Sequence, residues 1–381
     1  METMFRVADQ VPASSTLEAI LEVARWAPSA DNTQPWRFEI TQSGQLVVHG
    51  SDTRADCVYD LDGRISQLAV GALLETIRIA ATVHGLECVA ERRGASAETH
   101  PTFDLRFFSD PAIARDPLVD AVRARTVQRR ALSTRPLTSA EIGELEASVG
   151  PDYRVCWLQS TGERLRLTRM LVTNGRLRLR LREAFDVHRN AIDWNATESI
   201  DKLPDRAIGL DPVSLRLTRW AFRSWERFSF LDRYLAGTVL ASVELDLVPG
   251  LACAAHFLIV AARPPTELDD FIEGGRALQR FWLTATRLGL LLQPEVSPLV
   301  FARYHRNGVR YTASPACEAV GDRVSSMLAA QVGEDTVARS VFMGRIGEGR
   351  QPRARSTRLP LATLLRSNRS AGRSVPHAQG R

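Results

Sequence analysis

The segment ARWAPSADNTQPWRFEI, residues 24–40, places side-chain amides and hydroxyls between an apolar helical run and a strand-like stretch. Asn, Ser and Gln offer hydrogen-bond donors and acceptors whose charge does not change near neutral pH. Such groups suit recognition of the edge of a heterocycle better than proton transfer. A binding loop is one interpretation, and an ordinary polar turn after a proline-stopped helix is the other. The candidate residues are Pro28, Ser29, Asn32 and Gln34.

Other common kinds of site are not indicated. The seven histidines show no spacing typical of metal ligands, so we expect no metal centre. His256 lies in an apolar stretch and is expected to be a core residue with satisfied hydrogen bonds. No G-x-S-x-G elbow and no glycine-rich phosphate loop opens a helix after a strand, which argues against a hydrolase triad and a Rossmann site.

The composition of the 381 residues, 44% of them hydrophobic, is that of an ordinary globular protein. The longest apolar runs fall short of the roughly 20 residues that cross a bilayer, so we expect no membrane span. The amino-terminal stretch lacks the features of a signal peptide, and the five cysteines form no CxxC pair. These features predict a cytoplasmic protein without a zinc site or a disulfide framework.

Positive charge gathers near the carboxyl terminus, in an arginine-rich stretch over residues 346–381. That stretch has no aromatic residues to stack on bases, so nucleic-acid binding is the weaker interpretation. If the stretch did bind nucleic acid, the binding would collapse with salt.

The elements that must position the loop fall into two halves. GALLETIRIAATVHGL (71–86) aligns without a gap to GRALQRFWLTATRLGL (275–290), with glycines shared at both ends. Each copy reads as a long amphipathic helix with a glycine C-cap, followed by a strand. The match predicts a duplicated domain.

The predicted fold class is α+β, with two tandem halves. We place the first half at 1–115, the second at 116–360, and a flexible Arg-rich tail at 361–381. In the first half we expect helices at 16–27 and 65–84 and strands at 36–41, 45–50, 86–93 and 102–108. In the second we expect helices at 117–124, 139–149, from 162, along the repeat and at 313–331, with strands at 153–158, 252–262, 290–295 and 338–345.

Residues 186–240 have no counterpart in the first half and are rich in Trp and Phe. Two extra helices that pack on the core are the simpler interpretation. A lid over a planar ligand is the alternative, because such lids occur on insertions into a rigid scaffold.

The order A-R-x-A-P-S-x-x-N-x-Q-P-W-R-F resembles the flavin-contacting motif of the FMN-dependent nitroreductase family. The resemblance implies a nitroreductase-like fold in which two subunits bind FMN at their interface. In that family the loop comes from one subunit, and arginines near the start of the other hold the phosphate.

The family's R-x-S-x-R-like string is absent before the loop and appears instead at the head of the second half, as RTVQRRALSTRPL. The resemblance therefore implies that Arg125 and Arg129 bind the FMN phosphate. Each half then holds what the other lacks, which predicts a fused pseudo-dimer with one complete FMN site and one that has decayed.

Two further strings extend the resemblance. VFMGRIGEGRQPRARSTRLPL is similar to the family's carboxyl-terminal strand and nominates Arg355 and Arg358 for the phosphate, whereas LGLLLQPEVSP nominates Gln293 and Pro294 beside the flavin. Arginine suits a phosphate because its planar fork binds bidentately and keeps its charge. The string DLDGR (60–64) is similar to the fused-duplicate, Acg-like branch.

The resemblance implies an FMN-dependent oxidoreductase that passes hydride from NAD(P)H to a small-molecule acceptor, with no catalytic side chain nominated. A flavin-sequestering protein with little turnover and an oxidase that tailors a peptide-derived ring are the alternatives. The chain would act as a monomeric pseudo-dimer or as a homodimer.

Overall fold

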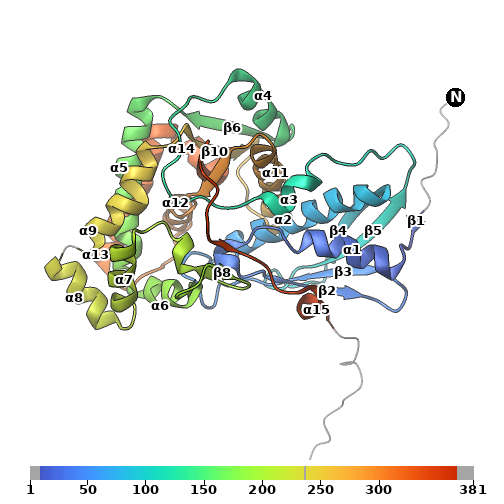
Figure 1. The fold of residues 1–381 in the computed structure, drawn as a ribbon, viewed down its shortest axis with the longest axis horizontal. Helices are drawn as coiled ribbons and strands as arrows, with labels where there is room; N and C mark the ends of the chain where they lie inside the picture. Colours follow the sequence, from blue (N-terminus) through green and yellow to red (C-terminus); the bar gives the residue numbers. More distant parts are fainter. Residues whose placement is uncertain (1–8, 236, 367–381) are drawn as a thin grey trace, which may run out of the picture.

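The structure is a computed structural model that describes residues 9–235 and 237–366. Figure 1 shows two halves side by side, the first coloured blue to cyan and the second green to orange. Each half has its own antiparallel sheet with helices against it. The predicted α+β class with two tandem halves is therefore confirmed.

The sheet of the first half is centred on β5, which pairs with β4, β3 and the short β1. Its strands are β1 (Asp9–Gln10), β2 (Trp36–Ile40), β3 (Leu46–Gly50), β4 (Leu86–Arg92) and β5 (Thr102–Ser109). Its helical elements are α1 (Ser14–Ala24), η1 (Ala30–Asn32), α2 (Arg64–Ala81) and η2 (Thr82–His84). The apolar side chains of α1 and α2 bury against one face of this sheet and form its core.

The second sheet has the order β11-β12-β10-β6. These strands are β6 (Tyr153–Leu158), β10 (Ala255–Ala261), β11 (Leu291–Pro294) and β12 (Ser340–Gly347). The helices of this half are α3 (Val119–Ala124), α4 (Ser139–Ser148), α5 (Thr161–Arg180), α11 (Leu268–Arg287), α12 (Ser297–Asn307), α13 (Pro315–Val332) and α14 (Glu334–Arg339). A Ser or Thr with a Glu three residues later forms a capping box at the start of both α4 and α5.

The two repeat helices, α2 and α11, join the halves by crossing each other. Gly71 and Gly275 meet at the crossing, where the Cα of Gly275 lies 3.0 Å from the position that a Cβ on Gly71 would take. Gly is required here because the two backbones approach too closely for any side chain. The two copies found in the sequence thus form a contact between the two halves.

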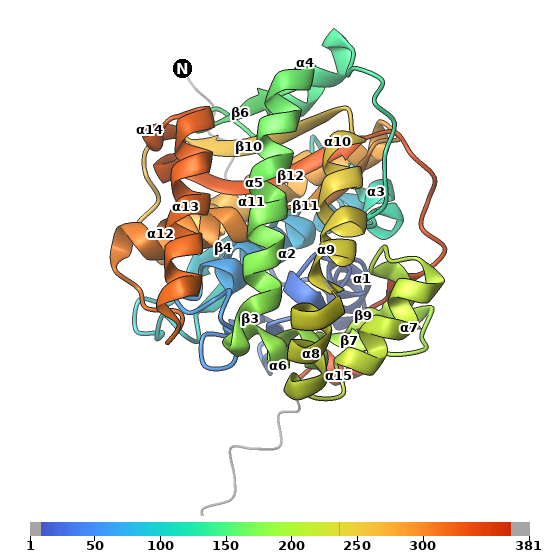
Figure 2. The same ribbon diagram turned by 90° about the vertical axis from the view of Figure 1, so that its left-hand side faces the viewer.

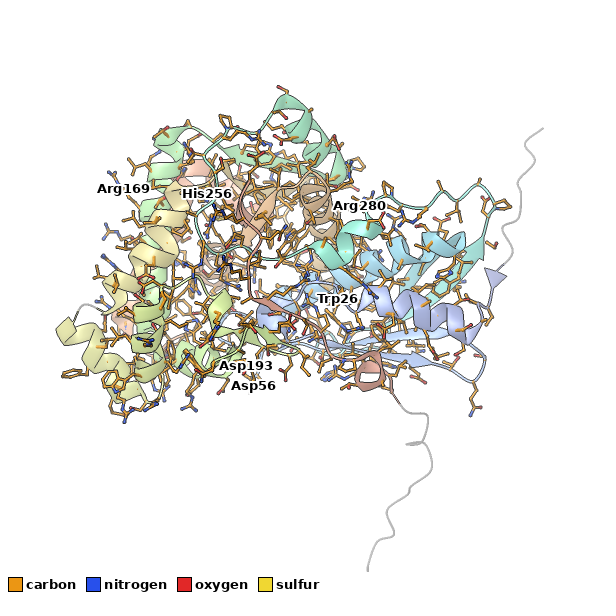
Figure 3. The ribbon with its side chains drawn as sticks, viewed as in Figure 1. Trp26, Asp56, Arg169, Asp193, His256 and Arg280 are labelled. Atoms are coloured by element: carbon orange, nitrogen blue, oxygen red, sulfur yellow. The ribbon has the colours of Figure 1, made fainter. Side chains whose placement is uncertain are left out.

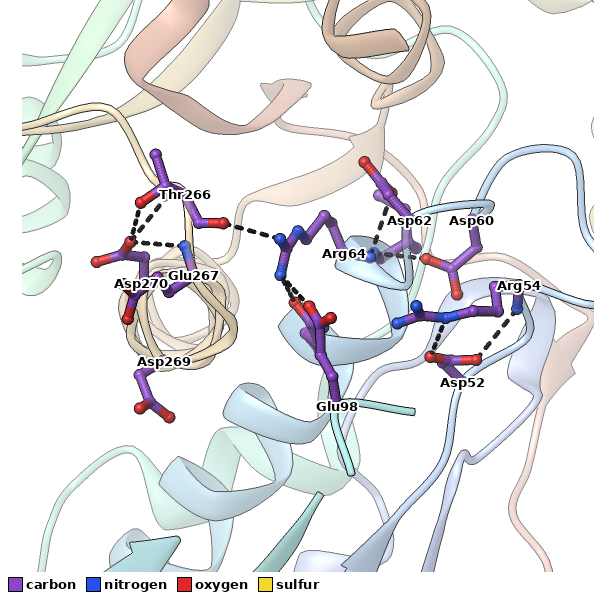
Figure 4. A network of polar contacts seen from close by, with 12 residues as sticks. Asp52, Arg54, Asp60, Asp62, Arg64, Glu98, Thr266, Glu267, Asp269 and Asp270 are labelled. Atoms are coloured by element: carbon purple, nitrogen blue, oxygen red, sulfur yellow. Dashed lines mark hydrogen bonds and ion pairs between the residues drawn. The ribbon is translucent and has the colours of Figure 1, made fainter. Parts of the chain in front are cut away.

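The string DLDGR positions the start of α2. Asp60 is buried and accepts hydrogen bonds from the backbone N–H groups of Ile65 at 2.8 Å and Ser66 at 3.3 Å, which caps the helix. Arg64 then donates to the carbonyl of Thr266, just before α11, at 2.8 Å (Figure 4). The motif is therefore structural: it caps α2 and ties it to the second half.

The insertion contains more elements than the two predicted helices, and it continues to residue 251. They are α6 (Arg182–Ala191), β7 (Ile192–Asp193), β8 (Glu198–Ser199), β9 (Leu203–Pro204), η3 (Asp205–Ala207), α7 (Pro212–Ala221), α8 (Trp225–Leu235), α9 (Gly237–Ser242), a π-helix (Val243–Leu247) and α10 (Val248–Leu251). Figure 2 shows α5 between α13 and α9, with α6, α7 and α8 gathered near its lower end.

The carboxyl-terminal segment returns to the first half, as the red strand in Figure 1 shows. Here β13 (Arg355–Ser356) pairs in parallel with β8, and α15 (Leu361–Leu364) buries both of its terminal leucines in the first core. The prediction that the flexible tail starts at residue 361 is therefore wrong for 361–366. Apolar spacing inside a basic stretch holds those residues in place, and residues 367–381 lie outside the described part.

One helix among the described residues, Arg64–His84, has the length and hydropathy of a membrane span, but 83% of its apolar window is buried within the fold. This helix belongs to the core of the first half, and a buried core helix can have the same length and hydropathy as a membrane span.

Candidate functional site

A cavity of about 460 Å³ lies between the two halves, below the insertion. Its size is within the range of small-molecule sites. Nine of the ten predicted site residues line it, and Gln34 does not. The nine are Pro28, Ser29, Asn32, Arg125, Arg129, Gln293, Pro294, Arg355 and Arg358. Residues from both halves thus line one cavity. Asn32 of the first half and Arg125 of the second are both part of its lining.

The loop after α1 has an unusual backbone. Asp31, Asn32 and Gln34 all have positive φ angles of 47°, 64° and 49°, although none is glycine. Each such residue costs on the order of 1 kcal/mol, and such strain gathers at functional sites. The loop therefore needs other contacts to hold it in this shape.

Gln34 supplies those contacts. Its backbone N–H donates to Ser29 Oγ at 3.0 Å, and its side-chain amide donates to the carbonyls of Asn32 at 3.0 Å and Ile200 at 2.8 Å. Its Oε1 accepts from the backbone N–H of Leu359 at 3.0 Å. All its polar groups are used within the protein, so Gln34 ties the loop to the insertion and the carboxyl-terminal segment and does not itself face the cavity.

Asn32 keeps one polar atom free for the cavity. Its Nδ2 donates to the carbonyls of Thr357 at 3.2 Å and Lys202 at 3.4 Å, whereas its buried Oδ1 has no hydrogen-bond partner among the described residues. A buried acceptor without a partner is costly unless a ligand satisfies it.

Three arginines converge at one end of the cavity. Arg125 donates to the carbonyl of Trp26 at 3.1 Å, and Arg355 donates to the carbonyl of Arg123 at 3.0 Å. Arg358 donates to the carbonyl of Ala27 at 3.0 Å. Figure 3 labels Trp26 near the junction of the two halves. No carboxylate lies within 4.0 Å of these three guanidinium groups in the described part of the chain.

The electrostatics of the arginines follow from this crowding. Burial, together with Arg358 and Arg355, lowers the pKa of Arg125, whose guanidinium also lies 4.6 Å from the Trp282 ring centre. Burial, then Arg355 and Arg25, lowers the pKa of Arg358 to about 9. The Nε atoms of Arg125 and Arg355 have no partner within the described chain. This end of the cavity is therefore an anion site by charge and by unused donors.

Arg129 lies in a different part of the cavity from the one predicted. It donates to the carbonyl of Ala207 at 3.3 Å, and burial lowers its pKa to about 10 although Asp31 opposes the shift. Arg345 and Arg178 are the other charges that act on it. Arg355 acts on both Arg125 and Arg358, whereas Arg129 is not among the charges that act on either of them.

The turn after β11 forms a further wall. Val127 makes a β-bridge with Leu292, which sets residues 125–129 beside Gln293 and Pro294. Gln293 Nε2 donates to the carbonyl of Pro294 at 2.9 Å, and the buried Oε1 has no partner among the described residues. This oxygen is a second free acceptor in the lining.

Sequence reasoning did not identify a second polar group in the cavity, made of Asp31, Tyr59, Arg178, His188 and Asp246. Tyr59 Oη lies 3.0 Å from His188 Nε2, and the two rings stack with centres 5.6 Å apart. Burial and the nearby Arg178 lower the pKa of His188 to about 3, so it is neutral. Only Asp31 carried a signal, because it lies in the loop motif.

Aromatic residues of the insertion close the far side. Phe222 and Phe228 line the cavity, with ring centres 5.1 Å apart, and Phe185 stacks on Phe222 at 5.4 Å behind them. This wall is apolar and excludes water from that side.

His256 lies outside the cavity lining and is fully buried. Its two ring nitrogens lie 2.8 Å from Glu295 Oε2 and 2.8 Å from the Gly250 carbonyl, which confirms the prediction of a satisfied core histidine.

The family model "Nitroreductase family" matches residues 7–66, which include α1 and the loop. Uncharacterized protein MT1398 of Mycobacterium tuberculosis (strain CDC 1551 / Oshkosh) is 26% identical to the chain over 294 residues. The match covers 76% of this chain and 40% of the relative, so the chain spans less than half of that protein's length.

Two solved structures are also similar. The nitroreductase-like family protein from Bacillus cereus is 11% identical with a TM-score of 0.35, and covers 67% of this chain and 97% of its own. The FMN-dependent nitroreductase NfnB from Mycobacterium smegmatis, solved in complex with NADPH, is 15% identical with a TM-score of 0.36, and covers 65% and 96%. Both TM-scores are too low to support a statement about this chain. The family match, by contrast, falls on the loop motif, so the predicted resemblance to the nitroreductase family is confirmed for residues 7–66.

Proposed function

We propose that the chain is an FMN-dependent oxidoreductase that passes hydride from NADH or NADPH to a small-molecule acceptor. One observation carries this proposal: two buried arginines, Arg125 and Arg358, and the half-buried Arg355 have no carboxylate partner among the described residues and share a cavity with the strained loop of the family match. A phosphate monoester carries close to two negative charges, which would compensate this cluster.

The chemistry of the lining fits the rest of FMN. Asn32 Oδ1 and Gln293 Oε1 are acceptors without partners among the described residues, and a flavin ring edge offers N–H groups to satisfy one or both. Leu68, Ala69 and Ala72 on α2 and Leu278 and Trp282 on α11 all line the cavity, which gives a planar ring an apolar surface.

Bound FMN would supply the hydride chemistry, and the chain's own residues would bind and orient it. Arg125, Arg355 and Arg358 would hold the phosphate from the second half, and loop residues 28–32 would contact the ring from the first. The wall of Phe222 and Phe228 would exclude water and limit the size of the acceptor.

The test begins with the absorption spectrum of the purified protein and identification of the ligand released by heat. We expect FMN. Anaerobic addition of NADPH or NADH to the flavin-loaded protein should then bleach the yellow colour within seconds. A protein that takes up neither FMN nor riboflavin would contradict the proposal.

A flavin-sequestering role is the second candidate, and the closed aromatic wall favours it. In that case the colour would persist with both nicotinamides and bleach with dithionite. Replacing Phe222 and Phe228 with alanine should then make the bound flavin reducible by NADPH, because the wall is what excludes it.

A further inference from the structure

The Asp246 carboxylate lines the cavity on the side of the insertion. No hydrogen bond or ion pair to it is found within residues 9–235 and 237–366. A half-buried carboxylate without a partner is unusual, because buried charges are normally paired. Leu171 and Leu245 also line the cavity and are apolar.

Two backbone features give the Asp246 side chain its place in the cavity. It lies in the five-residue π-helix Val243–Leu247, a rare form that is frequent at functional sites. Across from it, Gly175 of α5 has no side chain, and a Cβ there would lie 2.8 Å from Asp246 Cγ. A glycine at this point of α5 therefore makes room for the carboxylate, although glycine costs helix stability.

Charged groups act on Asp246 from each side. The three charges that act on it through space are Arg178 of α5, Glu295 of the turn after β11, and Arg345 of β12. The helices α9 and α10, which also contact the π-helix, carry no charged residue. Burial raises the pKa of Asp246 to about 7, with Arg178 and Arg345 opposing and Glu295 assisting the shift.

We propose that Asp246 donates a proton to an oxygen atom of the acceptor as the acceptor is reduced, with a quinone as the test compound. The inference rests on the proposed function and deepens it. Asp246 shares the cavity with the loop, the arginine cluster and the apolar wall of Phe222 and Phe228. A protonated carboxyl group in a cavity of this kind can act as a general acid toward a bound compound.

Two electrons reach the acceptor as a hydride that originates from the reduced nicotinamide. The O–H bond of the Asp246 carboxyl breaks, its proton bonds to the acceptor oxygen, and the carboxylate keeps the electron pair. A proton from water then restores the carboxyl group, so one hydride and one proton convert the quinone to its hydroquinone.

The test compares wild type with Asp246→Asn, which keeps the shape of the side chain and cannot donate a carboxyl proton. Asp186→Asn, on the exposed face of α6, is the matched control. With 1,4-naphthoquinone as the probe, reoxidation of the reduced protein should be about 100-fold slower in Asp246→Asn. The wild-type rate should fall about tenfold per pH unit above about 7, whereas the variant rate should not change with pH.

A second readout needs no flavin. Infrared absorption of the flavin-free protein should show a protonated carboxyl that titrates near pH 7 in wild type and Asp186→Asn, and that is missing in Asp246→Asn. An unchanged pH profile in Asp246→Asn, or no such carboxyl, would overturn the inference. Failure of the wild type to bind FMN would contradict the proposed function instead, whereas the infrared measurement of the Asp246 carboxyl group would remain valid.

Discussion

Gly71 and Gly275 are in backbone contact where α2 crosses α11, with each Cα about 3 Å from where the other's Cβ would be, and α11 carries Leu278 and Trp282 from there into the cavity. The crossing therefore fixes the distance between the half that holds the loop and the half that holds the arginines.

Gly71→Ala should destabilise the protein by about 1–3 kcal/mol, because its methyl group would meet the carbonyl oxygen of Ile272, which is backbone and cannot move aside. Urea denaturation measures the change. Gly143→Ala in α4 is the matched control: nothing lies within 4 Å of its Cβ position, so it should stabilise by about 0.5–1 kcal/mol. Equal midpoints for the two variants would contradict the tight crossing.

Arg358→Met should weaken FMN binding about 10- to 100-fold, since a charge-assisted hydrogen bond contributes about 1.5–3 kcal/mol. Riboflavin lacks the phosphate, so its affinity should not change. Quenching of flavin fluorescence measures both affinities. Arg169→Met, on the exposed face of α5 and labelled in Figure 3, serves as the control. A parallel loss of riboflavin binding would place Arg358 at the ring instead of the phosphate.

His188 should make the protein acid-labile. Its pKa is about 3 when folded and near 6.5 when unfolded, so the unfolded state binds the extra proton between these values. Stability from the neutral form is complete above pH 6.5 and is lost as pH falls toward 3, at up to roughly 1.4 kcal/mol per pH unit. Asp246 opposes this trend, so wild type must be compared with His188→Gln, whose acid slope should be shallower by that amount.

His256→Gln gives the opposite pattern. Burial lowers the pKa of His256, but Glu295 and Cys253 outweigh this and raise it to about 10. Its contribution is complete below pH 6.5 and is lost as pH rises through 10, so this variant should flatten the alkaline limb. It also removes a partner that lowers the pKa of Glu295, so the acid limb changes as well. Chemical denaturation at several pH values measures both limbs, and an unchanged alkaline limb in His256→Gln would contradict the assignment.

The strand and helix ends could be predicted because they depend on residues that are close together in the sequence. The strand at 153–158 was predicted with its observed ends, and the repeat helix ends where its glycine predicts. Helix α12 (Ser297–Asn307) was missed, because it follows the proline turn of β11 and buries residues on most of its surface, which weakens its periodicity.

The site was predictable where one motif carries it and not where tertiary structure assembles it. The loop and the arginines lie in short strings, so nine residues were placed in the cavity. Gln34 was expected to face the ligand. In the folded chain its side-chain amide instead donates to the carbonyl of Ile200 and accepts from the N–H of Leu359. Tyr59 and Asp246 line the same cavity only in the folded chain, and no sequence spacing links them.

The pseudo-symmetric position opposite the cavity should bind no second flavin. The alignment that pairs Gly71 with Gly275 places Arg78 where the cavity has Trp282. Glu75, nearly buried, pairs there with Arg78 at 2.6 Å, Arg280 at 3.1 Å and Arg276 at 3.6 Å.

An ion network fills this second position, and its arginines are already neutralised by carboxylates, so no unpaired charge is left for a phosphate. We expect one FMN per chain, measured as flavin absorbance against protein concentration from amino-acid analysis. Glu75→Gln loosens the network without rebuilding a loop like that of residues 28–34, so it should also bind one. Two flavins per chain in either protein would contradict the division of one complete site between the two halves.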